Sequence, residues 1–163
     1  MTQKVRQMVR AAVIGALYVV LTHLQNLIFP NSASMAIQFR ASEALCVLAF
    51  FTPAAIPGLT VGCLLFNLTF IGSLPLDFLV GTLATLGAAA SMRLLRRLPF
   101  LGLLMPALWN AFLVGWELSV YIGGGFWLNA LYVAIGEAAV LLTLGTALYY
   151  ALKARNLHIR LFS

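Results

Sequence analysis

Long apolar runs separated by short polar breaks dominate the pattern of hydrophobic and polar positions along the chain. Six apolar segments can be drawn, at about 8–29, 40–52, 56–71, 76–95, 101–122 and 127–152. Proline and glycine end several of them, as at Pro30, Pro53 and the glycines at 123–125, because neither residue continues a helix well. About twenty apolar residues are needed for a helix to cross a bilayer. The pattern therefore predicts an all-α integral membrane protein, a single transmembrane domain of six helices over residues 1–163.

The second segment, 40–52, is too short to cross a membrane as an ordinary α-helix. Its length corresponds to a rise of about 20 Å, against a hydrocarbon core of about 30 Å. The segment either starts earlier, within the preceding SMAIQF, or is a broken helix. Pro53 and Pro57 predict a sharp turn after it, because each removes a backbone donor and restricts the residue before it.

Composition supports this reading and charge adds an orientation. Hydrophobic residues make up 63% of the chain and charged residues 9%, whereas soluble domains have about 25% charged residues. Nine of the ten basic residues form three groups: Lys4, Arg6 and Arg10; Arg93, Arg96 and Arg97; and Lys153, Arg155 and Arg160. Six spans would place all three groups on one face, and an excess of lysine and arginine marks the cytoplasmic face. We therefore expect both termini to be cytoplasmic, and the net charge of +6 to reflect topology and not nucleic-acid binding.

All four acidic residues avoid the predicted cytoplasmic surface. They are Glu43, Asp77, Glu117 and Glu137. Ionisable groups within a bilayer usually face the bundle interior or a wet cavity. Glu117 and Glu137 have no cation nearby in the sequence, so we expect another helix or a ligand to supply their partner. Glu43 could instead pair with Arg40 three residues away, and Asp77 could simply occupy the first turn of a helix.

Amide and aromatic side chains provide further candidates in the same region. They are Asn67, Asn110, Asn129, Trp109 and Trp116. A tryptophan ring could stack on a planar ligand, although anchoring at the membrane interface is the alternative for both tryptophans. Cys46 and Cys63 lie within apolar runs, which favours small buried hydrophobes over a disulfide or a metal pair.

Small residues recur at a spacing of four in the first segment, at Ala11 and Gly15 and at Ala12 and Ala16. This spacing lets helices approach closely. Packing inside the protein is the default interpretation, and a docking face for a partner helix is the alternative.

No catalytic or energy-coupling motif is present in the sequence. It contains no phosphate loop, no HExxH, no GxSxG and no His/Cys spacing typical of a metal site. We therefore expect no catalytic residue, no metal and no cofactor. Uphill transport by this chain would need a partner or an ion gradient.

Five segments in order give the sequence a resemblance to a known family. They are IQFRASEAL (37–45), FTPAAIPGLTVGCLLFN (51–67), LDFLVGTLATLGAA (76–89), PALWNAFLVGWEL (106–118) and FWLNALYVAIGEAAVLLTLG (126–145). With these segments the chain resembles the QueT-type queuosine-precursor transporters, which are substrate-binding S-components of energy-coupling factor (ECF) transporters. The resemblance implies a six-helix bundle in a bacterial cell membrane. Its partners would be a transmembrane coupling subunit and two cytoplasmic ATPases, and its solute a 7-deazaguanine such as preQ1.

The resemblance also implies roles for the candidate residues. One carboxylate would accept the N1–H and exocyclic amine of a deazaguanine, and a second would neutralise the aminomethyl cation of preQ1. We expect Glu43, Glu117 and Glu137 to fill these roles, in no fixed order, with Arg40 and Asp77 nearby. An amide of Asn67, Asn110 or Asn129 could read the carbonyl edge, and Trp109 or Trp116 could stack on the bicycle.

Two further expectations follow from the same resemblance. Ala12 and Ala16, with Ala11 and Gly15, would contact the coupling subunit, and the segment at about 30–39 would close over the outer pocket. The alternatives are an S-component for another vitamin or nucleobase, a standalone proton-coupled carrier with Glu137 as its proton site, and a scaffold that binds no solute.

Overall fold

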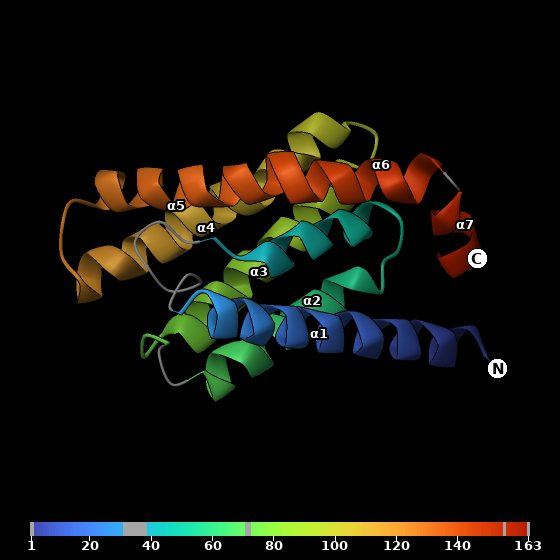
Figure 1. Ribbon diagram of the computed structural model, residues 1–163, viewed down its shortest axis with the longest axis horizontal. Helices are drawn as coiled ribbons and strands as arrows, with labels where there is room; N and C mark the ends of the chain where they lie inside the picture. Colours follow the sequence, from blue (N-terminus) through green and yellow to red (C-terminus); the bar gives the residue numbers. More distant parts are fainter. Residues whose placement is uncertain (1, 31–38, 71–72, 155, 163) are drawn as a thin grey trace.

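The computed structural model describes residues 2–30, 39–70, 73–154 and 156–162, and every regular element within these ranges is helical. The elements are α1 (Gln3–Ile28), η1 (Ala41–Phe50), α2 (Ala55–Thr69), α3 (Asp77–Leu94), α4 (Pro99–Tyr121), α5 (Phe126–Val140), η2 (Leu141–Gly145), α6 (Thr146–Ala154) and α7 (Leu157–Phe162). The chain from α5 through the π turn η2 to α6 is one continuous rod, Phe126–Ala154 (Figure 1). The predicted all-α architecture is confirmed for these residues, with one helix or rod in each predicted apolar segment.

Three of the described helices are long and apolar enough to cross a membrane. They are α1, α4 and the rod at Phe126–Ala154. The other three predicted spans correspond to η1, α2 and α3, of which η1 and α2 are shorter apolar helices. A crossing by all six segments stays a prediction.

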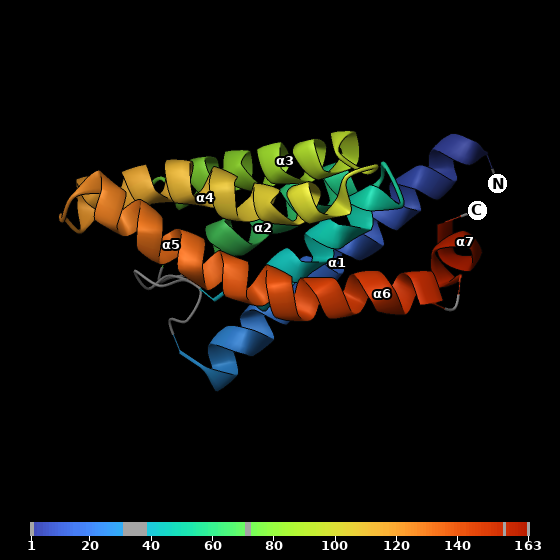
Figure 2. The ribbon, with the colours of Figure 1, turned by 90° about the horizontal axis from the view of Figure 1, so that it is seen from above.

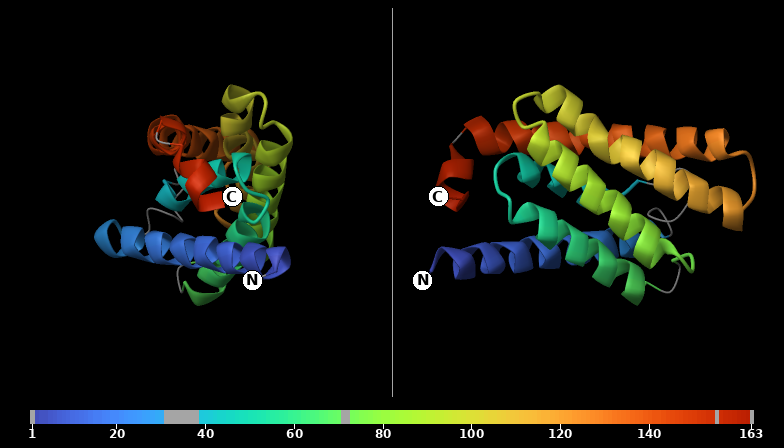
Figure 3. Two further views of the ribbon diagram at one scale, coloured as in Figure 1. Left: turned by 90° about the vertical axis from the view of Figure 1, so that its right-hand side faces the viewer. Right: turned by 180° about the vertical axis from the view of Figure 1, so that it is seen from behind.

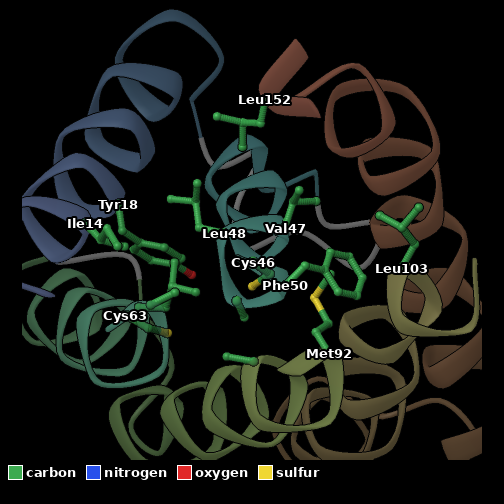
Figure 4. Packing of buried hydrophobic residues seen from close by; sticks show 14 of the residues in the cluster. Ile14, Tyr18, Cys46, Val47, Leu48, Phe50, Cys63, Met92, Leu103 and Leu152 are labelled. Carbon is green, nitrogen blue, oxygen red and sulfur yellow. The ribbon is translucent and has the colours of Figure 1, made fainter. Parts of the chain in front are cut away.

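The second predicted segment is a 3₁₀-helix of ten residues, η1. It lies in the middle of the bundle, where core side chains from α1, α2, α3, α4 and α6 surround it (Figure 4). Eight of its ten residues are buried. After it the chain turns at Phe51 to Ala54 and enters α2, so the predicted turn at Pro53 is confirmed. Pro57, also expected in the turn, lies instead in the first turn of α2, where a helix leaves its backbone N–H groups unpaired. A segment too short for a standard membrane helix is therefore the central element of the fold.

Neighbouring helices pack in chain order, α1 on α2, α2 on α3, α3 on α4 and α4 on α5. The closest approach joins α1 and α2 through Gly15, Gly58 and Gly62. A Cβ atom added to Gly58 would lie 2.6 Å from the carbonyl oxygen of Ala11, and one added to Gly15 would lie 2.8 Å from that of Gly58. The small residues thus allow contact between the two backbones.

The four small residues of α1 divide between two faces. Gly15 is buried and Ala11 is half-buried on the side that meets α2. These two residues therefore pack inside the protein and do not form an exposed docking face. Ala12 and Ala16 are exposed.

Both termini lie at the same end of the bundle (Figures 1, 2 and 3). Described basic residues gather at this end. Lys4 and Pro53 line one cavity, Arg93 donates to the carbonyl oxygen of Phe50, and Lys153 contacts Tyr149, whose ring packs on Phe50. Arg155 lies outside the described residues. The clustering agrees with the charge pattern from which the cytoplasmic face was predicted.

A tight turn between α4 and α5 returns the chain along α4 (Figure 2). Gly123 and Gly124 have φ angles of +87° and +77°, which glycine adopts without a steric penalty. The two helices then pack closely, because a Cβ atom added to Gly115 would lie 2.8 Å from the Cα of Ala130.

Gly58→Ala should lower the melting temperature of the purified protein. The added methyl group would overlap the backbone of α1, and overpacking of this kind costs about 1–3 kcal/mol. Gly125→Ala is the matched control, because no atom lies within 4 Å of its added Cβ atom and its φ of −72° suits alanine. Equal melting temperatures for the two variants would show that the α1–α2 contact is not tightly packed.

Candidate functional site

Six of the predicted site residues converge inside the bundle. Each belongs to, or directly precedes, one of five helices, and each is at most 5% exposed. We call this set the interior polar cluster: Arg40 and Glu43 at the start of η1, Asn67 on α2, Asp77 on α3, Glu117 on α4 and Glu137 on α5. The sequence therefore identified charged residues that the fold brings together from distant positions.

Glu43 is held by side chains from three elements. The hydroxyl of Tyr18 donates to its Oε1 at 2.6 Å and that of Thr85 at 3.5 Å, and the thiol of Cys46 donates to its Oε2 at 3.2 Å. Hydrogen bonds to a carboxylate are stronger than neutral ones. Glu43 is therefore oriented by α1, α3 and its own helix in addition to its electrostatic interaction with Arg40.

Asp77 organises the turn that leads into α3. Its Oδ2 accepts a hydrogen bond from the backbone N–H of Leu74 at 2.9 Å, and its carbonyl oxygen accepts one from Asn67 Nδ2 at 2.8 Å. It occupies the first turn of α3, as one of the two predicted alternatives proposed. The other carboxylate oxygen, Oδ1, is buried and has no conventional donor among the described residues, while the Asp77 side chain lies within hydrogen-bonding reach of the Glu117 carboxyl group.

Glu117 and Glu137 are the least satisfied carboxyl groups of the cluster. Both are fully buried or nearly so, at 0% and 1% exposure. The two carboxyl oxygens of Glu137 have no hydrogen-bond partner in the described part of the chain. The carboxyl group of Glu117 has no conventional donor there, but it lies within hydrogen-bonding reach of the Asp77 carboxyl group and the backbone of Leu76. Glu117 interacts electrostatically with Asp77, Glu137 with Glu43, and both with Arg40. Buried polar atoms are normally hydrogen-bonded, so these oxygens mark a place suited to a donor-rich ligand.

Arg40 is the one buried basic side chain among the residues described. It interacts electrostatically with Asp77 and Glu43, and its guanidinium carbon lies 5.8 Å from the centre of the Phe66 ring. Four acidic side chains therefore surround a single cation. The interior has an excess of acidic groups and favours an additional positive charge.

Four predicted site residues have their described contacts elsewhere. Trp109 donates through Nε1 to Ser91 Oγ at 3.0 Å and lies against Gly87, and it is 39% exposed, whereas Trp116 is 48% exposed. These exposures match the surface alternative for tryptophan. The Nδ2 groups of Asn110 and Asn129 donate to backbone carbonyls of their own helix and of the α4–α5 turn. A role in solute binding stays a prediction for all four.

Sequence reasoning missed the residues that position Glu43. Tyr18 and Thr85 are fully buried hydroxyl residues on predicted helices, and a hydroxyl within an apolar run was the available signal. Cys46 and Cys63 are free and buried, as expected, but both also join polar contacts: Cys46 donates to Glu43, and Cys63 Sγ accepts from Asn67 at 3.5 Å.

Two other predictions, a segment that closes the pocket and the absence of a metal site, can be compared only with the described residues. Residues 31–38, most of the segment predicted to close the pocket, lie outside the described residues. Within the described ranges, no group of three or more His, Cys, Asp or Glu side chains is placed to hold a metal ion.

Comparison with known proteins gives one family. A family model described as "QueT transporter" matches residues 8–154. The chain is also 39% identical over 84 residues to the "Queuosine precursor transporter QueT" of Lactococcus lactis subsp. cremoris (strain MG1363), a match that covers 51% of this chain and 47% of that protein. The matched region thus spans about half the length of this curated relative. No solved structure matches the chain.

Tyr18→Phe should destabilise the protein, because it removes the 2.6 Å hydrogen bond to the buried carboxyl of Glu43. The long 3.5 Å contact from Thr85 to the same oxygen remains, and loss of a hydrogen bond to a charged group costs about 1.5–3 kcal/mol. Tyr149→Phe is the matched control, since its hydroxyl accepts only a long, exposed contact from Lys153 at 3.5 Å. Thermal unfolding in detergent measures both, and an equal effect of the two changes would contradict the assigned role of Tyr18.

Proposed function

The chain belongs to the QueT transporter family, and from that premise we propose that it captures a queuosine precursor, a 7-deazaguanine such as preQ1, in the interior polar cluster. The observation that carries the proposal is the buried carboxyl group of Glu137, whose oxygens have no hydrogen-bond partner among the described residues, together with the buried acidic pair of Glu117 and Asp77. Residues of an S-component would only bind and release solute. ATP hydrolysis would belong to partner subunits.

The chemistry of preQ1 complements that of the cluster. The base offers N1–H and an exocyclic amine, which are donors on one edge, and its aminomethyl group is a cation at neutral pH. One carboxylate can accept the two donors and a second can pair with the cation. Glu117 and Glu137 are best suited to these roles, because Glu43 already accepts from Tyr18, Thr85 and Cys46. Glu43 would then support the site from beneath.

A neighbouring acceptor and Arg40 would complete the recognition. Asn67 Oδ1 is buried and has no described partner, so it can accept a further donor from the solute. Arg40 would limit repulsion among the acids and orient the solute's carbonyl edge. A neutral base without the aminomethyl group would leave one acid uncompensated and bind more weakly.

Delivery would depend on partners at the membrane. We propose a multi-pass arrangement in a bacterial cell membrane, with both termini cytoplasmic, on the evidence of the basic residues grouped at one end. Ala12 and Ala16 are exposed on α1 and would form the contact with a transmembrane coupling subunit. Two cytoplasmic ATPases would drive release of the solute inside.

Calorimetry of the purified protein should detect preQ1 binding at micromolar concentration or below, with guanine binding at least tenfold more weakly. Glu117→Gln and Glu137→Gln should each weaken preQ1 binding by roughly 10- to 150-fold, the equivalent of about 1.5–3 kcal/mol for a bond to a charged group. Ser119→Ala on α4 is the control, because its hydroxyl only bonds the carbonyl oxygen of Trp116. Undiminished binding by both glutamate variants would reject this site.

Ala12→Trp and Ala16→Trp should leave preQ1 binding intact and abolish uptake by cells that contain the partner subunits. Both positions are exposed, so a bulky side chain obstructs docking but not folding. Leu142→Trp is the control at another exposed position, 58% exposed on η2, and it should transport normally. Loss of binding by the alanine variants would contradict docking, and uptake that persists without the ATPases would indicate a standalone carrier.

A further inference from the structure

A basic, open cavity lies at the C-terminal end of α3, whereas Asp77 of the interior polar cluster lies at the N-terminal end of the same helix. Its volume is about 530 Å³, and Ala90, Arg93, Leu94, Arg96 and Arg97 line it. No acidic residue lines it, and the four acids of the chain are all buried in the cluster described above. The cavity therefore has a concentrated positive charge with no protein carboxylate to neutralise it.

One arginine of the cavity is fixed and two are exposed. Arg93 Nη1 donates to the carbonyl oxygen of Phe50 at 3.0 Å, which holds this guanidinium against the end of η1. Arg96 and Arg97 follow the end of α3 and are exposed to the surroundings. Guanidinium groups bind phosphate through paired hydrogen bonds. The arrangement combines a positioned arginine with two that can adjust to an anion.

An apolar stripe leads away from the cavity along α3. Its members are exposed and follow a helical spacing of three or four residues: Leu79, Leu83, Leu86, Ala90 and Leu94. Ala90 and Leu94 belong to both the stripe and the cavity wall. The stripe covers about 22 Å of helix, comparable with an extended acyl chain. Trp109, held by its bond to Ser91 and packed on Gly87, borders the stripe from α4.

We propose that this cavity binds the phosphate headgroup of an anionic phospholipid, with one acyl chain along the α3 stripe. Basic pockets on the cytoplasmic side of membrane helices suit such headgroups. A free phosphate would use the arginines but not the adjoining stripe, so the continuity of charge and apolar surface favours a lipid. The inference depends on the membrane setting of the fold and not on the identity of the transported solute.

Arg93 connects the lipid site to the central helix. The same side chain lines the cavity and bonds the last carbonyl group of η1. A bound lipid phosphate would hold Arg93 in this position, so occupancy should stabilise the folded protein.

The test is native mass spectrometry and thermal unfolding of the full chain in neutral detergent, with phosphatidylglycerol or phosphatidylcholine added. Phosphatidylglycerol should be retained at least tenfold better and should raise the melting temperature. The double variant Arg96→Ala/Arg97→Ala should lose both effects, whereas Lys153→Ala, which removes an exposed basic residue at the same end, should keep them.

A second variant tests the shape of the site without changing its charge. Ala90→Trp fills the junction of cavity and stripe at an exposed position and should also reduce phosphatidylglycerol retention. The proposal would be overturned by equal retention of the two lipids, by an equal loss in Lys153→Ala, or by equal stabilisation with millimolar inorganic phosphate alone. Unchanged retention in both Ala90→Trp and the arginine double variant would place the lipid elsewhere.

Discussion

The burial of four carboxyl groups and one guanidinium group inside an apolar bundle is the constraint on which the rest of the structure depends. Charges removed from water are costly unless other groups replace their solvation. Glu43 meets this requirement with donors from three elements, and Asp77 with the turn before α3. Glu137 does not meet it within the described chain, and Glu117 has another acid, Asp77, and the backbone of Leu76 beside it. Buried carboxyl groups without donors destabilise the fold, and a donor-rich solute can supply the missing hydrogen bonds.

The sequence predicts the positions of the helices and the identity of the buried acids, because both depend on local composition. Apolar runs located the helices from α1 to α6 to within about five residues but did not predict α7 (Leu157–Phe162). Acids such as Glu137 were recognisable because charges are rare in such runs. The direction of a side chain depends on which helix face is covered, which only packing decides. Trp109 therefore lies against α3 and not in the cluster, and Tyr18 was missed although it bonds Glu43.

The interior of the bundle and the end that carries the termini have opposite chemical characters. Acidic groups are gathered in the interior around Arg40, whereas the basic groups near the termini remain at the surface, close to Phe50 and Pro53. The central helix η1 connects them, because Glu43 lies in its first turn and Phe50 is its last residue. In the proposed arrangement, η1 would therefore join the solute site to the contacts at the cytoplasmic end.

The winding of η1 is itself a component of the site. A 3₁₀-helix turns about 120° per residue, so every third side chain points the same way. Glu43 and Cys46 stand on one such line, which is why the thiol reaches the carboxylate at 3.2 Å. In an α-helix, with about 100° per residue, their directions would differ by roughly 60°. The same ten residues could remain helical and buried, and acid and thiol would still be neighbours three residues apart, but they would no longer stand on one line along the helix.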